Sequence, residues 1–257
     1  MINYGNNSND MKKIIISTFI AFVLLSWASS ARAQALLDLE SGLVLTGYNN
    51  VRIPGDEGTL FSLKDDLIPN AEFFYRLRLD YTLKSRHTFS LLFAPLEINS
   101  AGSSATDIFF EGVEFPANAE LIGTYKFNSY RLTYRYDIVQ KPRFEFGLGI
   151  TAKIRDAEIA LSSQDLNSKK TNVGFVPIIN FRFFWKIDEK FGLLLDGDAL
   201  AAPQGRAEDV QIAASYKISD NFKMRIGYRI LEGGADNAVV YNFSLFHYAA
   251  AGISYTF

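Results

Sequence analysis

Apolar and polar residues alternate along most of the chain. In the segment FFYRLRLDYTL, Phe73, Tyr75 and Leu77 share one parity, whereas Arg76 has the other. A period of two predicts β-strands, because successive side chains of a strand point to opposite faces of the sheet. Segments of this kind, each of roughly ten residues, follow one another from residue 34 onward, and we count ten of them.

The connections between these segments alternate in length. The short turns comprise residues 84–86, 137–142, 188–190 and 219–221, and the longer polar loops comprise residues 49–70, 99–119, 161–172, 201–207 and 233–239. Short turns at one end and long loops at the other are typical of outer-membrane barrels. An even number of strands then puts both ends of the barrel domain on the short-turn, periplasmic side.

So many apolar strand faces need a hydrophobic environment to cover them. In hydrocarbon each unpaired backbone group costs several kcal/mol, so a sheet that spans a membrane has to close on itself. We therefore predict an all-β protein, a transmembrane antiparallel up-and-down β-barrel of about ten strands. Eight or twelve strands stay open as alternatives, because the loops 49–70 and 99–119 could hide or extend a hairpin. A secreted soluble β-sandwich is disfavoured, since small and charged residues would occupy its core face.

The N-terminal region has the features of a secretory signal. The segment MKKIIISTFIAFVLLSWASSARA begins at Met11 with two lysines, continues as a short apolar run and ends in an A-x-A site at Ala33. We predict cleavage after Ala33, so that residues 1–33 are an upstream extension plus signal peptide and residues 34–257 are the barrel. No later stretch reaches the ~20 apolar residues of a transmembrane helix.

The C-terminal segment YAAAGISYTF ends in Phe257, with Ile253 and Tyr255 at the alternate positions before it. This pattern resembles the C-terminal assembly signal of Gram-negative outer-membrane β-barrel proteins. The resemblance implies recognition by the barrel-assembly machinery, location in the outer membrane, and contact with its lipid and lipopolysaccharide.

Composition narrows the function classes further. A formal net charge of −2 gives no field that favours nucleic acid as a partner. There is no cysteine, no glycine-rich phosphate loop, and no His/Cys cluster with metal-ligand spacing. We expect no cofactor, no metal ion and a monomeric barrel.

The faces opposite the apolar ones are expected to line the lumen. Twelve basic residues have this parity: Arg76, Arg78, Arg131, Arg135, Lys153, Arg155, Arg182, Lys186, Lys217, Lys223, Arg225 and Arg229. Six acidic residues share it: Asp38, Glu40, Asp80, Glu145, Asp196 and Asp198. The sequence therefore predicts a polar, net-basic lumen. The alternation slips near residues 126–129 and 155–157, and a one-residue slip would turn a strand inside out.

Two functions fit such a lumen. In a structural or interaction barrel the charges pair with one another, for example Arg76 and Arg78 with Asp38 and Glu40 on the neighbouring strand, because an unpaired buried charge is costly. In a porin-like protein the arginines instead form a narrow path that prefers small anions. The apolar segment TDIFFEGVEFP in the loop 99–119 either plugs the mouth or contacts a partner or lipid outside.

A hydrolase at the barrel rim is the alternative from another class. Asp196 and Asp198 share one face, placed near the outer lip, and a bulge in LFHYAAAG would turn His247 inward. This set is similar in part to the site of omptin proteases, ten-stranded barrels with two acidic groups and a His–Asp pair. A lipid-modifying enzyme would need His247 beside a serine, but Ser244 lies on the opposite parity. Because only one Asp pair and one His match, we favour the non-enzymatic barrel.

Overall fold

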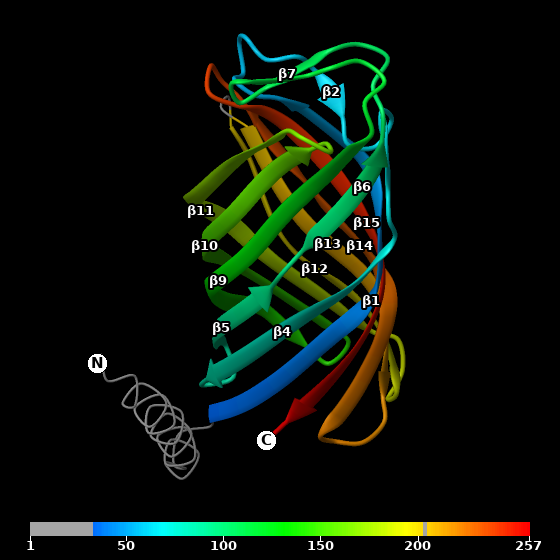
Figure 1. Ribbon diagram of the computed structural model, residues 1–257. Helices are drawn as coiled ribbons and strands as arrows, with labels where there is room; N and C mark the ends of the chain where they lie inside the picture. The colour runs from blue at the N-terminus through cyan, green and yellow to red at the C-terminus, as the bar shows by residue number, and fades with distance from the viewer. Residues whose placement is uncertain (1–32, 203–204) are drawn as a thin grey trace, which may run out of the picture.

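The wall of the molecule is a closed antiparallel β-barrel of ten strands, as the alternation predicted (Figure 1). The computed structural model describes residues 33–202 and 205–257. The barrel closes where the last strand pairs with the first, Leu37 opposite Tyr255. The wall strands are β1 (Ala33–Arg52), β4 (Glu72–Leu83), β5 (His87–Ala94), β9 (Leu121–Lys141), β10 (Phe144–Ser162), β11 (Asn167–Lys186), β12 (Phe191–Ala202), β13 (Gly205–Lys217), β14 (Phe222–Asp236) and β15 (Tyr241–Thr256).

The two long loops add no strand that runs the length of the wall. The short strands β2 (Phe61–Ser62) and β3 (Leu67–Pro69) pair with β1 and β6, and β7 (Ile108–Phe110) and β8 (Val113–Phe115) form a separate hairpin. The strand β6 (Glu97–Gly102) pairs with β9, as β5 does, and so continues the same wall strand beyond a break at Pro95. The eight- and twelve-strand alternatives are therefore wrong.

The two ends of the barrel differ in their connections. We call the end with the short turns and the C-terminus the inner end, and the end with the long loops the outer end (Figure 1). The predicted loop 161–172 is shorter than expected, because β10 and β11 continue until only residues 163–166 connect them.

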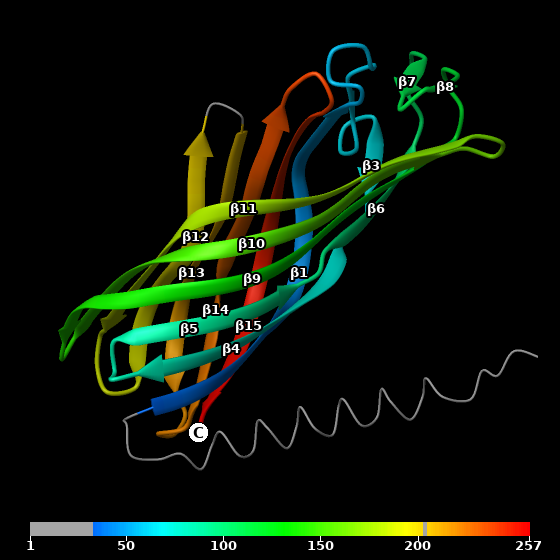
Figure 2. The same ribbon diagram turned by 90° about the vertical axis from the view of Figure 1, so that its left-hand side faces the viewer.

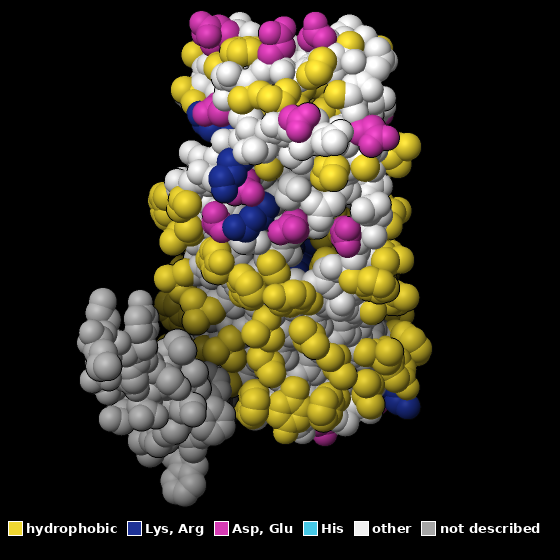
Figure 3. All heavy atoms as spheres, in the orientation of Figure 1, with side chains coloured by type: hydrophobic (Ala, Val, Ile, Leu, Met, Phe, Trp, Pro, Cys, Tyr) yellow, Lys and Arg dark blue, Asp and Glu magenta, His cyan; other side chains and the backbone are white. Residues whose placement is uncertain are grey.

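Apolar side chains cover the inner part of the wall on the face seen in Figure 3, and exposed apolar residues occur on all the wall strands, so together they form a belt. Phe73, Ile150 and Ile226 point outward and are among its most exposed members. Lysine, arginine and acidic side chains appear on the outer part of the wall, above the belt (Figure 3). An exposed apolar band on a closed sheet is the surface that a bilayer covers, since hydrocarbon accepts apolar atoms and no free backbone edge.

The alternation is more regular than the sequence indicated. Pairing of β9 with β10 runs without a shift through residues 126–129 and 155–157, so the slips predicted there are wrong. The pairs shift at Gly47, between Thr46 and Tyr48, and again at Phe146/Gly147. The bulge beside His247 lies on β1 rather than on β15, and His247 keeps its outward parity.

The inner face of the wall changes character along the barrel. It is polar at mid-height and apolar near the outer end, where buried Val44, Phe74 and Tyr248 join one hydrophobic cluster with Phe110 and Phe115 of the second long loop. Among the described residues, no helix is long and apolar enough to cross a membrane.

Candidate functional site

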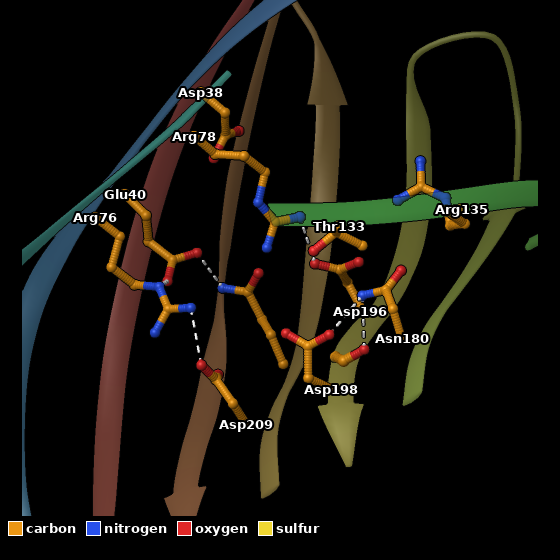
Figure 4. A network of polar contacts seen from close by, with 12 residues as sticks. Asp38, Glu40, Arg76, Arg78, Thr133, Arg135, Asn180, Asp196, Asp198 and Asp209 are labelled. Atoms are coloured by element: carbon orange, nitrogen blue, oxygen red, sulfur yellow. Dashed lines mark hydrogen bonds and ion pairs between the residues drawn. The ribbon is translucent and has the colours of Figure 1, made fainter. Parts of the chain in front are cut away.

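A network of ion pairs crosses the barrel at mid-height, and Asp209 of β13 lies at its centre (Figure 4). Arg76 of β4 donates to the Asp209 carboxylate over 2.9 Å, and Arg131 of β9 does so over 2.6 Å. Arg229 of β14 donates to its other oxygen. Three strands from different sides of the wall thus meet at one carboxylate, which is only 2% exposed.

Glu40 of β1 is the second centre of the network. Its carboxylate accepts from Arg229 Nε over 2.8 Å, from Arg225 Nη2 over 2.7 Å and from Gln211 Nε2 over 2.7 Å. Arg225 Nη2 also donates to Asp38 over 2.9 Å. All these carboxylate oxygens therefore have cationic or amide donors, which is what makes burial of such charges tolerable.

Asp196 and Asp198 of β12 complete the network. Arg78 donates to Asp196 over 2.9 Å, and Arg131 donates to Asp198 over 2.6 Å. The Thr151 hydroxyl adds a hydrogen bond to Asp198 over 2.7 Å. The network as a whole joins five guanidinium groups to five carboxylates, so its formal charges cancel. Its ionised members are Asp38, Glu40, Arg76, Arg78, Arg131, Asp196, Asp198, Asp209, Arg225 and Arg229.

The network separates two cavities. The lower cavity, of about 570 Å³, faces the inner end, and the upper chamber, of about 600 Å³, lies towards the outer end. No described residue lines both of them. The buried network therefore lies between the two cavities.

The upper chamber has mainly apolar walls and a basic side. Phe127, Val176, Leu200 and Leu231 are among its apolar lining. Lys153 also lines it, with its ammonium 4.6 Å from the centre of the Phe127 ring. The chamber is thus amphipathic, unlike the polar lower cavity.

The two long loops pack together at the outer end. Phe110 contacts Phe61 edge-on, with ring centres 5.9 Å apart, and Glu111 N donates to the Ile53 carbonyl over 2.9 Å. Lys170, near the outer end of β11, pairs with the Glu111 carboxylate over 2.8 Å. The apolar segment of the loop 99–119 therefore packs on the first long loop.

The residues predicted to line the lumen are distributed over these regions. Lys153 and Arg155 line the upper chamber, whereas Lys186 is exposed beside the inner end and Lys217 pairs with Asp220 over 2.6 Å in a turn. Arg78 lies opposite Asp38 in the β1–β4 register, yet its side chain reaches across the barrel to Asp196. The predicted residues that line the lower cavity outside the network are Asp80, Arg135, Glu145, Arg182 and Lys223.

Sequence reasoning missed Asp209 and Gln211. Both have the inward parity of β13, which begins at Gly205, several residues before the apolar alternation becomes evident at Val210. Continuing the alternation from outward-facing Val210 by one residue towards the N-terminus would have placed Asp209 on the inward face.

The candidate hydrolase residues are not brought together. Asp196 and Asp198 lie in the network at mid-height rather than at the rim, and both are held by arginines. His247 lies on the outer face, where its ring stacks on Tyr228 with centres 5.9 Å apart. Ser244 faces inward and bonds to Tyr125 over 3.0 Å. In residues 33–202 and 205–257, no cluster of His, Cys, Asp and Glu could hold a metal ion.

The architecture defines the class: the chain has the fold of Gram-negative outer-membrane β-barrel proteins. Outer membrane protease OmpT from Escherichia coli has a similar structure, with a TM-score of 0.55 at 12% identity, covering 90% of this chain and 100% of that chain. At this identity the likeness concerns the fold alone.

Two further solved structures are similar more distantly. An outer membrane channel from Pseudomonas putida F1 has a TM-score of 0.41 at 9% identity, covering 87% of this chain and 95% of that chain. Ail, the attachment invasion locus protein of Yersinia pestis, has a TM-score of 0.36 at 12% identity, covering 87% of this chain and 99% of that chain. No family model and no curated protein matches the chain.

Proposed function

We propose that this protein is an outer-membrane barrel with a closed lumen, which acts by binding at its outer end rather than by conducting solutes. The observation that carries this proposal is the division of the lumen, because no described residue lines both cavities. The proposal includes an orientation in the membrane, in which the inner end faces the periplasm and the long loops face the cell exterior. Export by a signal peptide cleaved after Ala33 belongs to the same proposal, and residues 1–32 lie outside the described part of the chain.

The electrostatics favour a closed barrel over an anion path. A fixed field that draws anions needs an excess of positive charge, whereas the network neutralises five arginines with five carboxylates. Conduction also requires side chains that release an ion readily. Arg76, Arg131 and Arg229, all held by Asp209, are not free to bind and release a passing anion.

A rim hydrolase has less support. Asp198 accepts from Arg131, Thr151 and Asn180, so its lone pairs are occupied and it is poorly suited to act as a general base. His247 on the outer wall is separated from it by the barrel wall.

Planar-bilayer recording under a salt gradient tests the closed barrel. We expect the refolded protein to give no steady conductance, with folding verified independently by heat-modifiable gel mobility and insertion verified by protection from protease. Steady anion-selective current from protein that passes both checks would overturn the proposal and restore the narrow pore.

A further inference from the structure

The seam between β11 and β12 is much shorter than the neighbouring seam. β11 pairs with β10 over nineteen residue pairs but with β12 over only eight, from Ile179↔Ala199 to Lys186↔Gly192. Residues 167–178 of β11 therefore have no partner in β12. Figure 2 shows β11 leaning away from β12 towards the outer end, and we call the space between them the gap.

The gap leads into the upper chamber. Val176 on the free part of β11 and Leu200 and Ala202 on the facing part of β12 all line the chamber. The free part of β11 and the end of β12 therefore both border the chamber.

The edge of the gap changes from apolar to polar along β11. Val173 and Phe175 point outward and are 71% and 67% exposed, continuing the apolar belt. Lys170 and Asn172, which line the chamber, follow towards the outer end. Such a gradient matches the boundary between hydrocarbon and headgroups of a membrane leaflet.

The backbone groups along the free edge of β11 need hydrogen-bond partners. Its backbone N–H and C=O groups towards β12 lack strand partners over residues 167–178, and such groups are costly in contact with hydrocarbon. A polar group located in the gap would satisfy some of them.

Two cations lie just inside this gap. Lys153 is opposite Val176 and Arg155 is opposite Gly174 in the β10–β11 register. Lys153 is only 3% exposed, and within the described part of the chain neither cation has a salt bridge. Arg155 donates to Asn172, but its Nε has no partner. A buried cation without an anion is unfavourable, so Lys153, with the half-buried Arg155 beside it, is poised for an acidic ligand.

We propose that the upper chamber binds an anionic lipid of the surrounding membrane, which enters sideways from the outer leaflet through the gap. Its acidic headgroup pairs with Lys153 and Arg155, and an acyl chain lies along the apolar chamber wall. The chamber volume of about 600 Å³ is adequate for this, since small-ligand sites span roughly 300–1,000 Å³. The proposal names the ligand for the binding role proposed above. It rests on that proposed function, in which the network closes the chamber on the side towards the inner end.

Lipid-specific fluorescence quenching tests the proposal. The chain has two tryptophans, Trp27 and Trp185, so Ala207→Trp combined with Trp27→Phe and Trp185→Phe leaves one indole, at a chamber-lining position beside Leu200 of β12. Phosphatidylglycerol with brominated acyl chains should quench it more strongly than brominated phosphatidylcholine at equal mole fraction. Adding Lys153→Met and Arg155→Gln should remove this headgroup preference.

A matched control uses the native indole. With only Trp27→Phe, the remaining Trp185 lies outward on the belt and should be quenched equally by both lipids. If Ala207→Trp fails to fold, as judged by heat-modifiable mobility, Val176→Trp in the same background gives the same readout at the edge of the gap.

Three results would overturn the proposal. Absence of quenching at position 207 would mean that no acyl chain enters, as expected if a strand of another chain covered the gap instead. Equal quenching by both lipids, or a preference that survives the double substitution, would mean that Lys153 and Arg155 do not select the headgroup. A conducting protein with quenching intact would instead contradict only the closed barrel.

Discussion

The network and the upper chamber differ in whether their inward-facing cations have carboxylate partners. In the network, Arg76, Arg131 and Arg229 converge on Asp209. A short distance along the barrel, Lys153 and Arg155 are turned inward beside the chamber, and neither forms a salt bridge with a described residue. Both regions have the same strand parity, and Lys153 is as buried as the three arginines, whereas Arg155 is half-buried. The main difference lies in whether the protein supplies the counter-charge itself.

This contrast distinguishes cations with a structural role from cations that we propose to bind a ligand. In the proposed function, cations that the protein pairs internally hold strands together and close the lumen. Cations that it leaves unpaired beside a cavity and an opening need an anion from outside. The charges of the network therefore cancel at mid-height, whereas Lys153 and Arg155 beside the chamber form no salt bridge with a described residue.

The largest expected effect comes from breaking the network. Asp209→Asn keeps the shape of the side chain but leaves three arginines short of one negative charge, and we expect a loss of about 3–5 kcal/mol in the free energy of unfolding. Urea unfolding in phosphatidylcholine vesicles measures it. Lys153→Met is the matched control, since replacing an unpaired buried cation by an apolar side chain should leave stability unchanged or higher in that lipid. Similar losses in both variants would remove the distinction between the two regions.

The apolar belt provides the next effect. Ile226→Arg introduces a charge at an outward position that is 70% exposed on the belt, and we expect it to cost about 2–4 kcal/mol. Leu79→Arg, on β4, tests the same parity on another strand. Glu189→Arg, in a turn at the inner end, should change stability by less than about 0.5 kcal/mol. Unfolding free energies in the same vesicles compare the three, and parental stability of Ile226→Arg would mean that the strand parity is inverted.

A smaller effect is expected from one hydroxyl in the network. Thr151→Val removes the hydrogen bond to Asp198, and Thr151 is fully buried. Loss of a buried hydrogen bond to a charged group should cost about 1–3 kcal/mol. Thr171→Val, on the exposed free part of β11, should be close to neutral. If both substitutions are neutral, the Asp198 end of the network does not contribute to stability.

The smallest effect is a pH dependence at the inner end. The backbone N–H groups of Phe191 and Lys190 donate to Asp188 in the turn and lower the pKa of its carboxyl. A carboxyl whose pKa is lower in the folded state stabilises above its unfolded pKa, and the contribution is lost as pH falls below about 4. The urea midpoint of the parent should fall slightly more over this range than that of Asp188→Asn. Parallel profiles would exclude the contribution.

The alternation was sufficient to predict the wall but not the contents of the barrel. Outward Phe73 and Ile226 and the turn positions follow from a period of two, which backbone geometry imposes on each strand separately. That Arg78 reaches Asp196 rather than the adjacent Asp38 depends on how strands far apart in sequence face one another across the lumen. Parity within a strand contains no such information.

The gap between β11 and β12 and the position of the bulge near His247 also could not be predicted from the alternation within one strand. The gap arises where β11 leans away from β12, although Val173 and Phe175 read as an ordinary strand. The bulge expected beside His247 lies instead at Gly47 on the partner strand, so the alternation of β15 is unbroken and His247 stays outward.

The central claim is that the paired cations hold the barrel and the unpaired ones bind lipid. We would measure the free energy of unfolding in phosphatidylcholine vesicles with and without added phosphatidylglycerol, because a ligand bound only by the native state stabilises it. The parent and Asp209→Asn should gain equally from the anionic lipid, although Asp209→Asn starts from a lower value, and Lys153→Met with Arg155→Gln should gain nothing. An undiminished gain in the double variant, or loss of the gain in Asp209→Asn, would contradict the account.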